Sequence, residues 1–369
     1  MRVLICGAGV IGASIAYFLS QRGVEAVVIE RTGIANAASG KSGGFLALDW
    51  CDGSALEPLA RRSFALHAEL AARIDDDWGY RRLDTLGVVA SARRDVGFYR
   101  KLALPDWLGG GVAVHARLGT TDTTAQVDPA AFTKAMMRAA IAEGAHVLIG
   151  TVQGLAFDAD GAVRGAVVDG QGIAGDAVVI AMGPWSVLAS QWLPLPAVYG
   201  LKGVSLVFRY VPEPLPHALF VELETEAGTL ASPEVFPRPD GTTYVCGLSS
   251  EAPLPVDPAA VVPDEGGPAR LRAMTAQFSP DLGQAEVLAE QACYRPVVED
   301  GLPLIGAVPG VGGAYVATGH SVWGMLNGPA TGEAVAELIA DGAARTVDLA
   351  PFDLARLAPL AASAVQAGA

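Results

Sequence analysis

The chain has 369 residues, of which 51% are hydrophobic and 17% are charged, so it can bury a large core and is long enough for two domains. Its net charge of −14 opposes the clustered positive charge that nucleic acid or anionic lipid requires, so we expect neither partner. No apolar run reaches the roughly 18 residues of a membrane span, and the 4 cysteines and 5 histidines lack metal-ligand spacing. The sequence therefore predicts a soluble, cytoplasmic protein without a metal site.

A βαβ unit is expected at the start of the chain. Residues 2–6 form a short apolar run that ends in glycines, which is typical of a buried parallel strand. Residues 10–22 have a helical composition, and Gly23 follows them where glycine often ends a helix. Residues 25–30 predict a second strand, so this unit has the length of about 30 residues that a dinucleotide-binding start requires.

The motif Gly7-Ala8-Gly9-Val10-Ile11-Gly12 lies between the first strand and the helix. Gly7 allows a tight turn, Gly9 lets the backbone approach a pyrophosphate, and Gly12 lets helix and strand pack closely. The phosphates then lie on the helix N-terminus, whose free N–H groups favour anions. Glu30 ends the second strand and can accept both ribose hydroxyls of an adenosine. This register favours a dinucleotide site over a glycine turn without a ligand, but it does not separate FAD from NAD.

A long loop and a capped helix are expected next. Residues 31–53 are rich in glycine and serine, and ordered loops of this length tend to be functional. Asp128 and Pro129 have the residue types of an N-cap and a first helical position, and the helix is expected to end at Gly144. The other expected elements are a helix over 54–76, short strands and a small helix over 80–118, and strands over 146–152, 161–169 and 176–183.

The remaining chain first changes its pattern and then returns to the first one. Residues 200–250 alternate in hydropathy and predict antiparallel strands, whereas residues 251–268 are rich in Pro and Asp and predict a surface loop. A helix over 268–278 and a strand over 292–296 are expected to follow. The end of the chain again predicts a strand, a glycine-rich turn and a helix, over 315–318, 319–328 and 329–342. The chain is therefore expected to leave the dinucleotide-binding domain and to return to it.

Six segments in order carry a family resemblance. They are GAGVIGASIAYFLSQRGVEAVVIE (7–30), ASGKSGGFLA (38–47), QVDPAAFTKAM (126–136), VVIAMGPWS (178–186), CYRPVVEDGLPLIG (293–306) and YVATGHSVWGMLNGPATGEAVAELI (315–339). In these segments the chain resembles the D-amino-acid-oxidase-like family of FAD-dependent oxidoreductases, which includes glycine oxidase and sarcosine oxidase. Two further segments, GGFLALDWCDG (43–53) and PEVFPRPDG (233–241), are similar to a sparsely characterised subgroup of oxidoreductases.

The resemblance implies an α/β fold in which a Rossmann-type FAD-binding domain carries an inserted antiparallel β-sheet domain for the substrate. The FAD-binding domain is expected to be discontinuous and to comprise residues 1–80, 126–200 and 290–369. The substrate-binding domain is expected to comprise residues 81–125 and 201–289. The substrate is then expected to lie between the two domains.

The resemblance also implies which residues hold FAD. The loop over 38–47 is expected to run along the cofactor, with Ser39 and Ser42 as donors, and the turn before Pro329 is expected to aim a helix N-terminus at the flavin. The alternatives are a plain linker, a merely capped helix and, for Val152, ordinary strand packing. The implied contacts are Gly7, Gly9, Val10, Ile11, Gly12, Glu30, Arg31, Ser39, Gly40, Ser42, Gly43, Gly44, Val152, Gly183, Trp185, Gly319, His320, Val322, Trp323, Gly324 and Met325.

Two charged residues are expected at the substrate. Arg295 matches the family arginine that holds a substrate carboxylate, and guanidinium suits this role because it can donate two parallel hydrogen bonds. The alternative for Arg295 is an ion pair with Glu299 or Asp300. Relatives also use tyrosines for the carboxylate, but the strand where we expect one carries Glu234, which suits an amine or a polyol better than an acid. The alternative for Glu234 is a solvent-facing strand residue.

Three further residues have open roles. Sarcosine oxidase uses a lysine near the flavin for the reaction with oxygen, and Lys41 or Lys202 could substitute for it here. His320 is expected near the flavin, either for acid–base work or as an anchor of the backbone. Cys293 matches the cysteine that carries the flavin covalently in sarcosine oxidase, and the alternative is a small buried thiol.

The expected reaction is oxidation of the C–N bond of an amine or amino acid. Hydride passes from the α-carbon to flavin N5, the resulting imine hydrolyses, and O2 or another acceptor takes the electrons. One alternative is an FAD-dependent dehydrogenase of a hydroxy acid or other alcohol, with His320 as base. The others are an NAD-linked dehydrogenase and a non-catalytic flavoprotein that acts in assembly or trafficking.

Overall fold

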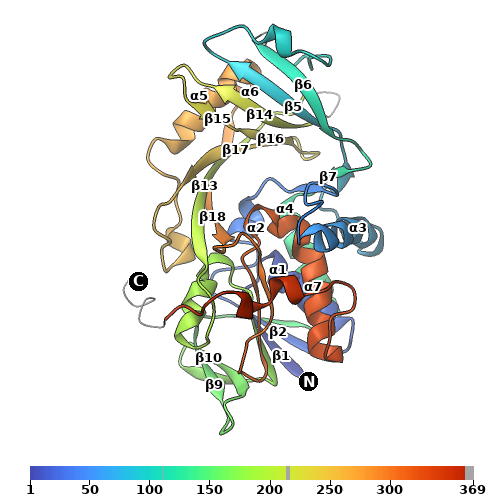
Figure 1. Ribbon diagram of the computed structural model, residues 1–369, viewed down its shortest axis with the longest axis vertical. Helices are drawn as coiled ribbons and strands as arrows, with labels where there is room; N and C mark the ends of the chain where they lie inside the picture. The colour runs from blue at the N-terminus through green and yellow to red at the C-terminus, as the bar shows by residue number, and fades with distance from the viewer. Residues whose placement is uncertain (110, 213–216, 362–369) are drawn as a thin grey trace.

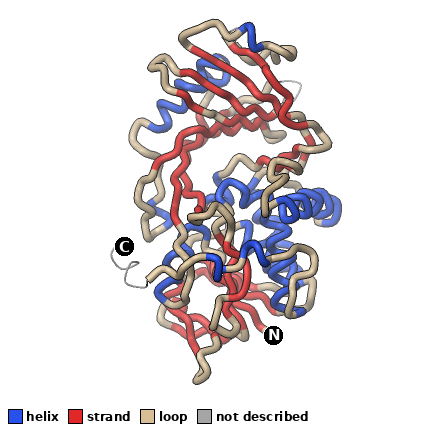
Figure 2. The backbone as a smooth tube through the Cα atoms, viewed as in Figure 1, coloured by secondary structure: helices blue, strands red, loops and turns tan. Residues whose placement is uncertain are grey.

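The computed structural model describes residues 1–109, 111–212 and 217–361, which form four β-sheets and the helices between them. Helices are concentrated in the lower part of the view in Figure 2, whereas long strands dominate the upper part. This arrangement confirms the expected α/β fold with a Rossmann-type unit and an added sheet. The expected domain limits stay a prediction, and residues 110, 213–216 and 362–369 of those ranges lie outside the described residues.

The six-stranded sheet in the lower part is parallel except at one edge, where its last strand pairs antiparallel. Its two central strands, β1 and β12, are apolar at every position except Arg2, because both faces are covered. Val3 and Ile5 face the helices on one side, and Leu4 and Cys6 face a second layer on the other side. In order across the sheet, the strands are β19 (Leu304–Ala307), β20 (Ala314–Thr318), β12 (Ala177–Ile180), β1 (Arg2–Cys6), β2 (Glu25–Glu30) and β8 (His146–Ile149).

The helical layer on the first face of this sheet consists of α1 (Val10–Ser20), α3 (Glu57–Arg73), α4 (Pro129–Ala142) and α7 (Gly324–Asp341). Helices α1 and α7 contact the strands, while α4 packs on α1 and α3 packs on α7. The sequence marks of α4 are confirmed, since the Asp128 side chain accepts a hydrogen bond from the Ala131 amide at 2.7 Å. Gly23 and Gly144 adopt positive φ angles of 69° and 96° after their helices. None of the described helices is long and apolar enough to cross a membrane.

The upper sheet consists of long strands, two of which rise from the lower part of the molecule (Figure 1). Most of its pairs are antiparallel, as the alternation predicts, but one pair is parallel. Helices α5 (Gly267–Phe278) and α6 (Pro280–Gln284) pack on it around Phe208 and Phe278. In order, the strands are β18 (Val287–Val297), β13 (Tyr199–Phe208), β17 (Thr243–Ser250), β16 (Glu234–Pro237), β14 (Ala218–Glu224), β5 (Thr85–Ser91) and β6 (Val112–Gly119), with β15 (Leu230–Ala231) beside β14.

The expected loop over 31–53 is shorter than predicted. It contains helix α2 (Ala38–Lys41) and strand β3 (Phe45–Ala47), which pairs with β7 (Thr124–Gln126). The sequence did not indicate this helix and this strand, because the segment is rich in small residues and composition alone cannot show that a partner strand lies nearby. Strand β4 (Arg81–Arg82) completes that sheet, and the remaining small sheet consists of β11 (Gln171–Ala174), β10 (Val163–Val168) and β9 (Val152–Phe157).

The expected start of the last helix after Pro329 is wrong. Helix α7 begins at Gly324, and Pro329 lies inside it. Proline removes one backbone N–H and crowds the preceding turn, but neighbouring side chains satisfy the groups that this frees. The ring Nε2 of His67 lies 3.0 Å from the Met325 carbonyl oxygen, and the Ser63 hydroxyl accepts from the Ala330 amide at 3.1 Å. Helix α3 therefore compensates for the proline, and α7 begins five residues earlier than the proline rule predicts.

Candidate active site

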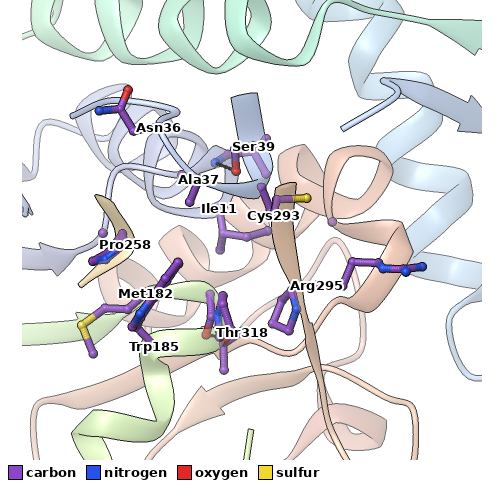
Figure 3. Close-up of a pocket in the computed structure, with 18 of the residues that line it drawn as sticks. Ile11, Asn36, Ala37, Ser39, Met182, Trp185, Pro258, Cys293, Arg295 and Thr318 are labelled. Carbon is purple, nitrogen blue, oxygen red and sulfur yellow. Dashed lines mark hydrogen bonds between the residues drawn. The ribbon is translucent and has the colours of Figure 1, made fainter. Parts of the chain in front are cut away.

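A cavity of about 810 Å³ runs from the carboxyl end of the six-stranded sheet to the face of the eight-stranded sheet. This volume lies in the upper range for small-molecule sites. Figure 3 shows Met182, Trp185 and Pro258 on one side of it, with Cys293 and Arg295 on the opposite side. We call the part lined by β1, β2 and β9 the nucleotide end, and the part lined by β16, β17 and β18 the inner end.

The glycine motif forms a close-packed turn at the nucleotide end. Gly7 has a φ of 110°, and a Cβ atom on it would lie 2.4 Å from the Ala181 carbonyl oxygen. A Cβ atom on Gly12 would lie 1.9 Å from the Gly7 carbonyl oxygen, so α1 packs on the turn itself. Gly9 faces the cavity, and the nearest atom to a Cβ there is the Ser39 hydroxyl oxygen at 3.0 Å. Each glycine therefore lacks a side chain for a separate steric reason.

The carboxylate of Glu30 is fixed beside this turn. One oxygen accepts from the Ala8 amide at 2.8 Å, and the other accepts from the Thr32 amide at 2.8 Å and the Thr32 hydroxyl at 3.1 Å. Each carboxylate oxygen can accept about two hydrogen bonds, so the first retains capacity for a ligand hydroxyl. Glu30 lines the cavity and is thus both a brace for the glycine turn and a candidate acceptor for ribose.

The serines of α2 and its following turn lie between the two ends. The Ser39 hydroxyl accepts from the Val10 amide at 2.9 Å, at the N-terminus of α1, and keeps its own proton for a ligand acceptor. The Ser42 hydroxyl lines the cavity and is buried without a hydrogen-bond partner among the described residues. A buried hydroxyl of this kind calls for a partner, and a ligand with oxygen acceptors would supply it.

The turn between β20 and α7 lines the cavity through His320, Val322, Gly324 and Met325. The N-terminus of α7 therefore opens onto it, with the positive end of the helix dipole. The His320 ring is directed to α7, where Nε2 lies 3.0 Å from the Thr331 hydroxyl. Burial lowers the pKa of His320 to about 3, so the ring is neutral at physiological pH.

The predicted surface loop after β17 covers part of the nucleotide end, which sequence reasoning missed. Val256 and Pro258 line the cavity, and three side chains from other elements donate hydrogen bonds to the carbonyl groups of this loop. Arg31 reaches the Val256 carbonyl at 2.8 Å, Trp185 reaches that of Pro255 at 2.7 Å, and Tyr294 reaches that of Pro253 at 2.7 Å. The only sequence signal was the proline content, which restricts the conformations of a loop.

The inner end carries the charged residues. Arg295 extends from β18, and its guanidinium donates to the Ser249 hydroxyl on β17. Asp300, the alternative partner of Arg295, pairs with Arg356 at 2.5 Å. Glu234 lines the same end from β16, half-buried, and its Oε2 accepts from the Cys246 thiol at 3.6 Å. Glu234 is therefore not the solvent-facing residue that the sequence left open.

Tyr244 lines the inner end and was missed in the sequence. It lies on β17, two pairs along from Glu234, because Glu234 pairs with Cys246, Val235 with Val245 and Phe236 with Tyr244. Its hydroxyl donates to the Lys41 carbonyl at 3.1 Å and so joins the upper sheet to α2. The alternation in the segment TTYVCGL contained the signal, since Tyr244 and Cys246 share a face.

Aromatic residues from the two subgroup-like segments pack together behind this wall. Phe45 stacks on Phe236 with ring centroids 5.5 Å apart. A Cβ atom on Gly43 would lie 2.4 Å from the Phe236 ring. Arg238 continues the contact, since it donates to the Ser42 carbonyl at 3.1 Å and to Asp128 at 3.2 Å. The loop that follows α2 and the β16–β17 hairpin thus form one packed unit.

Neither of the two lysines considered for oxygen chemistry lines the cavity. The ammonium of Lys202 lies 2.5 Å from Asp264 and is buried in that pair outside the cavity wall. Lys41 does not line the cavity, although its charge lowers the pKa of Cys293. Burial outweighs this effect and raises the pKa of Cys293, so the thiol is neutral. The role of Lys41 stays a prediction.

Most residues predicted for the site lie together in the cavity wall. Those that line it are Gly7, Gly9, Val10, Ile11, Glu30, Arg31, Ser39, Ser42, Gly43, Val152, Gly183, Trp185, Glu234, Arg295, His320, Val322, Gly324 and Met325. Those outside the wall are Gly12, Gly40, Lys41, Gly44, Gly319 and Trp323. Gly12, Gly40 and Gly44 have a packing role instead, since a Cβ atom on each would lie 2.0 Å or less from a backbone oxygen.

The residues present fit FAD. The glycine turn and the α1 N-terminus suit a pyrophosphate, and the Glu30 carboxylate suits a ribose. The buried Ser42 hydroxyl, which has no partner among the described residues, would donate a hydrogen bond to the cofactor. The cavity continues past them for a flavin and a small substrate. Among the described residues, no group of three or more His, Cys, Asp or Glu side chains could hold a metal ion.

Comparisons with known proteins agree with this fit. The model of the DAO family, described as FAD dependent oxidoreductase, matches residues 2–338. The chain is 31% identical to the glycine oxidase of Geobacillus kaustophilus over 96% of both proteins. It is 30% identical to a protein of Schizosaccharomyces pombe named as an oxidoreductase, over 95% of this chain and 97% of that protein. The crystal structure of glycine oxidase from Geobacillus kaustophilus is similar with a TM-score of 0.75 and 27% identity, and covers 96% of this chain and 98% of that one.

Proposed function

The chain belongs to the DAO family of FAD-dependent oxidoreductases, and we propose that it oxidises the C–N bond of a small amine or amino acid. The product is an imine, which water hydrolyses to a carbonyl compound and ammonia or a smaller amine. FAD, when bound, supplies the two-electron acceptor that takes hydride from the α-carbon of the substrate. O2 or another acceptor then receives the electrons.

The observation that carries this proposal is the inner end of the cavity. Arg295 and Glu234 place opposite charges in one wall, in a space continuous with the nucleotide end. Arg295 would bind a substrate carboxylate through paired hydrogen bonds, with Ser249 holding the guanidinium in place. The similarity to glycine oxidase of Geobacillus kaustophilus supports an amino-acid substrate.

The remaining residues of the wall position the reactants. The N-terminus of α7 would stabilise negative charge that the bound cofactor gains, because its N–H groups and dipole face the cavity. Tyr244 and the aromatic residues behind it exclude water from the inner end. Water exclusion strengthens the hydrogen bonds from Arg295 to the substrate carboxylate.

The hydroxy-acid alternative requires a base for the hydroxyl proton, and His320 was the candidate for it. The ring of His320 is instead bound to Thr331 on α7, and its pKa of about 3 makes it a weak base. This geometry supports the anchoring role for His320 and favours the amine over the alcohol.

A panel of substrates added without oxygen tests the proposal. Glycine, sarcosine, D- and L-alanine and lactate are each mixed with the holoenzyme, and the loss of flavin absorbance is followed. We expect bleaching by at least one of the amines and none by lactate. Repeating the reaction in air with a peroxide assay identifies the acceptor. Bleaching by lactate alone contradicts the proposal, and bleaching by none of the panel contradicts it for this substrate class.

A further inference from the structure

Glu234 stands out as a charged side chain in the cavity wall to which the proposed reaction assigns no step. It begins β16, and its backbone pairs with Phe220 on one side and Cys246 on the other. These two pairs hold it rigidly within the sheet. Its Oε2 accepts from the Cys246 thiol, whereas its Oε1 takes part in no hydrogen bond of the described residues. One carboxylate oxygen is therefore free to accept a donor from a ligand in the cavity.

Among the described residues that line the inner end, Glu234 is the one with a carboxyl group. Burial raises the pKa of Tyr244, of Cys246 and of Cys293, so these three side chains are neutral. Lys41 and Arg295 carry the positive charges. The groups that interact with Glu234 are Tyr244 and Cys246 from β17 and Arg295 from β18. Lys41 from α2 and Cys293 from β18 interact with each other in the same region.

Arg295 does not neutralise Glu234 by direct contact. In the part of the chain that the structure describes, Arg295 is directed to Ser249 and Glu234 to Cys246, and no ion pair joins the two charges. Two opposite charges in one wall without an ion pair match a ligand that carries both a carboxylate and an ammonium group. A molecule bound by its carboxylate at Arg295 would bring its nitrogen toward the anionic side.

The chemistry of the proposed reaction requires that this nitrogen loses a proton. Hydride leaves the α-carbon with help from the nitrogen lone pair, and an ammonium group has none. Amines with pKa values near 10 are almost fully protonated at pH 7. One proton must therefore leave the substrate nitrogen before each oxidation.

We propose that Glu234 binds the substrate ammonium group through Oε1 and accepts its proton, so that the bound amine is neutral when hydride leaves. In this step one N–H bond of the ammonium breaks and one O–H bond forms on Glu234, and the proton later passes to solvent. Burial raises the pKa of Glu234, while the Cys246 thiol and the charge of Arg295 lower it. The net upward shift brings the carboxylate nearer to the pKa of the amine, which is what an efficient proton acceptor requires. This inference rests on the proposed function.

The test compares Glu234→Gln, Glu234→Asp and a control, Glu222→Gln, whose side chain is exposed on β14. Flavin reduction in the holoenzyme is followed without oxygen between pH 6 and pH 10, with glycine, sarcosine and alanine as the probes. Glu234→Gln should slow reduction about 100-fold at pH 7, and the deficit should shrink toward pH 10, where the amine is neutral in solution. Glu234→Asp should regain part of the rate, and the control should match the unmodified protein.

A binding measurement separates this role from a structural one. Acetate, which has a carboxylate but no ammonium group, is titrated into each holoenzyme and followed by the change in flavin absorbance. Glu234→Gln should bind acetate at least as tightly as the unmodified protein, because a negative charge has been removed from the site. Weaker acetate binding in Glu234→Gln, or an equal rate deficit at every pH, would overturn the inference.

The outcomes also separate this inference from the proposed function. If amines bleach the unmodified protein and Glu234→Gln at equal rates at pH 7, the inference fails and the proposed function stands. If lactate bleaches the flavin and the amines do not, both fail together, because Glu234 then has no ammonium proton to accept.

Discussion

The two ends of the cavity are built by different means. At the nucleotide end, backbone groups face the ligand, and the conditions on the sequence are local: three glycines within one turn and a carboxylate at the end of the next strand. At the inner end, side chains from β16, β17 and β18 face the ligand, and residues far apart in the chain must meet. A change at the nucleotide end is therefore expected to remove the cofactor, whereas a change at the inner end should alter the substrate and leave the cofactor bound.

The largest effect is expected from Gly12→Ala. The added Cβ atom would lie 1.9 Å from the Gly7 carbonyl oxygen, and backbone cannot move aside as a side chain can. We expect the purified protein to lose at least about nine-tenths of its FAD and to unfold about 2 kcal/mol more easily. The ratio of flavin to protein absorbance measures the FAD content, and a thermal unfolding curve measures the stability. Gly172→Ala on β11 is the control, since a Cβ atom there would meet nothing within 4 Å.

The comparison predicts the opposite pattern for Arg295→Ala. Loss of a charge-assisted pair of hydrogen bonds costs about 3 kcal/mol, so KM for a carboxylate substrate should rise about 100-fold. The flavin content should not change, because Arg295 lies at the inner end. Steady-state kinetics with the best substrate of the panel measures KM. The control is Arg209→Ala, because Arg209 is exposed and pairs with Glu286 away from the cavity. An unchanged KM would refute the carboxylate role.

A smaller effect at the nucleotide end is expected from Glu30→Gln. The amide keeps one acceptor oxygen but loses the charge that holds the Ala8 and Thr32 amides. We expect FAD to bind the apoprotein about 10-fold more weakly, consistent with the loss of about 1.4 kcal/mol. Quenching of flavin fluorescence during titration measures the Kd. An affinity equal to that of the unmodified protein would mean that the carboxylate braces the turn without contributing to ligand binding.

The smallest effect at neutral pH concerns His320, and it appears in stability only when the pH falls. Burial lowers the pKa of His320 to about 3. Below about pH 6.5, His320 therefore binds a proton in the unfolded chain but stays neutral in the folded protein. The free energy of unfolding should therefore fall as the pH drops below 6.5, by up to about 1.4 kcal/mol per pH unit from this residue. Urea unfolding between pH 6.5 and 4.5 should show a shallower slope in His320→Asn than in the unmodified protein. The exposed His146, replaced by Asn, should leave the slope unchanged.

The same contrast explains which features the sequence could predict. The β1–α1–β2 unit and its glycines were predictable, because each condition concerns neighbours in the chain. Tyr244 was missed because its place beside Glu234 depends on the register of β16 against β17, which one sequence does not display. The start of α7 was wrong because the rule for proline ignores what His67 and Ser63 provide from another helix. The covering loop was missed because its anchors, Arg31, Trp185 and Tyr294, come from three separate segments.

The contact between Gly43 and Phe236 has a consequence for how this protein and its relatives diverge. A side chain at position 43 would overlap the Phe236 ring, so the loop after α2 and the substrate sheet cannot change independently. A relative that has alanine or serine at position 43 must therefore have a side chain smaller than phenylalanine at position 236. Among relatives, the two positions are therefore expected to co-vary in size. New substrate specificities should then arise through paired substitutions that link the cofactor loop to the inner end.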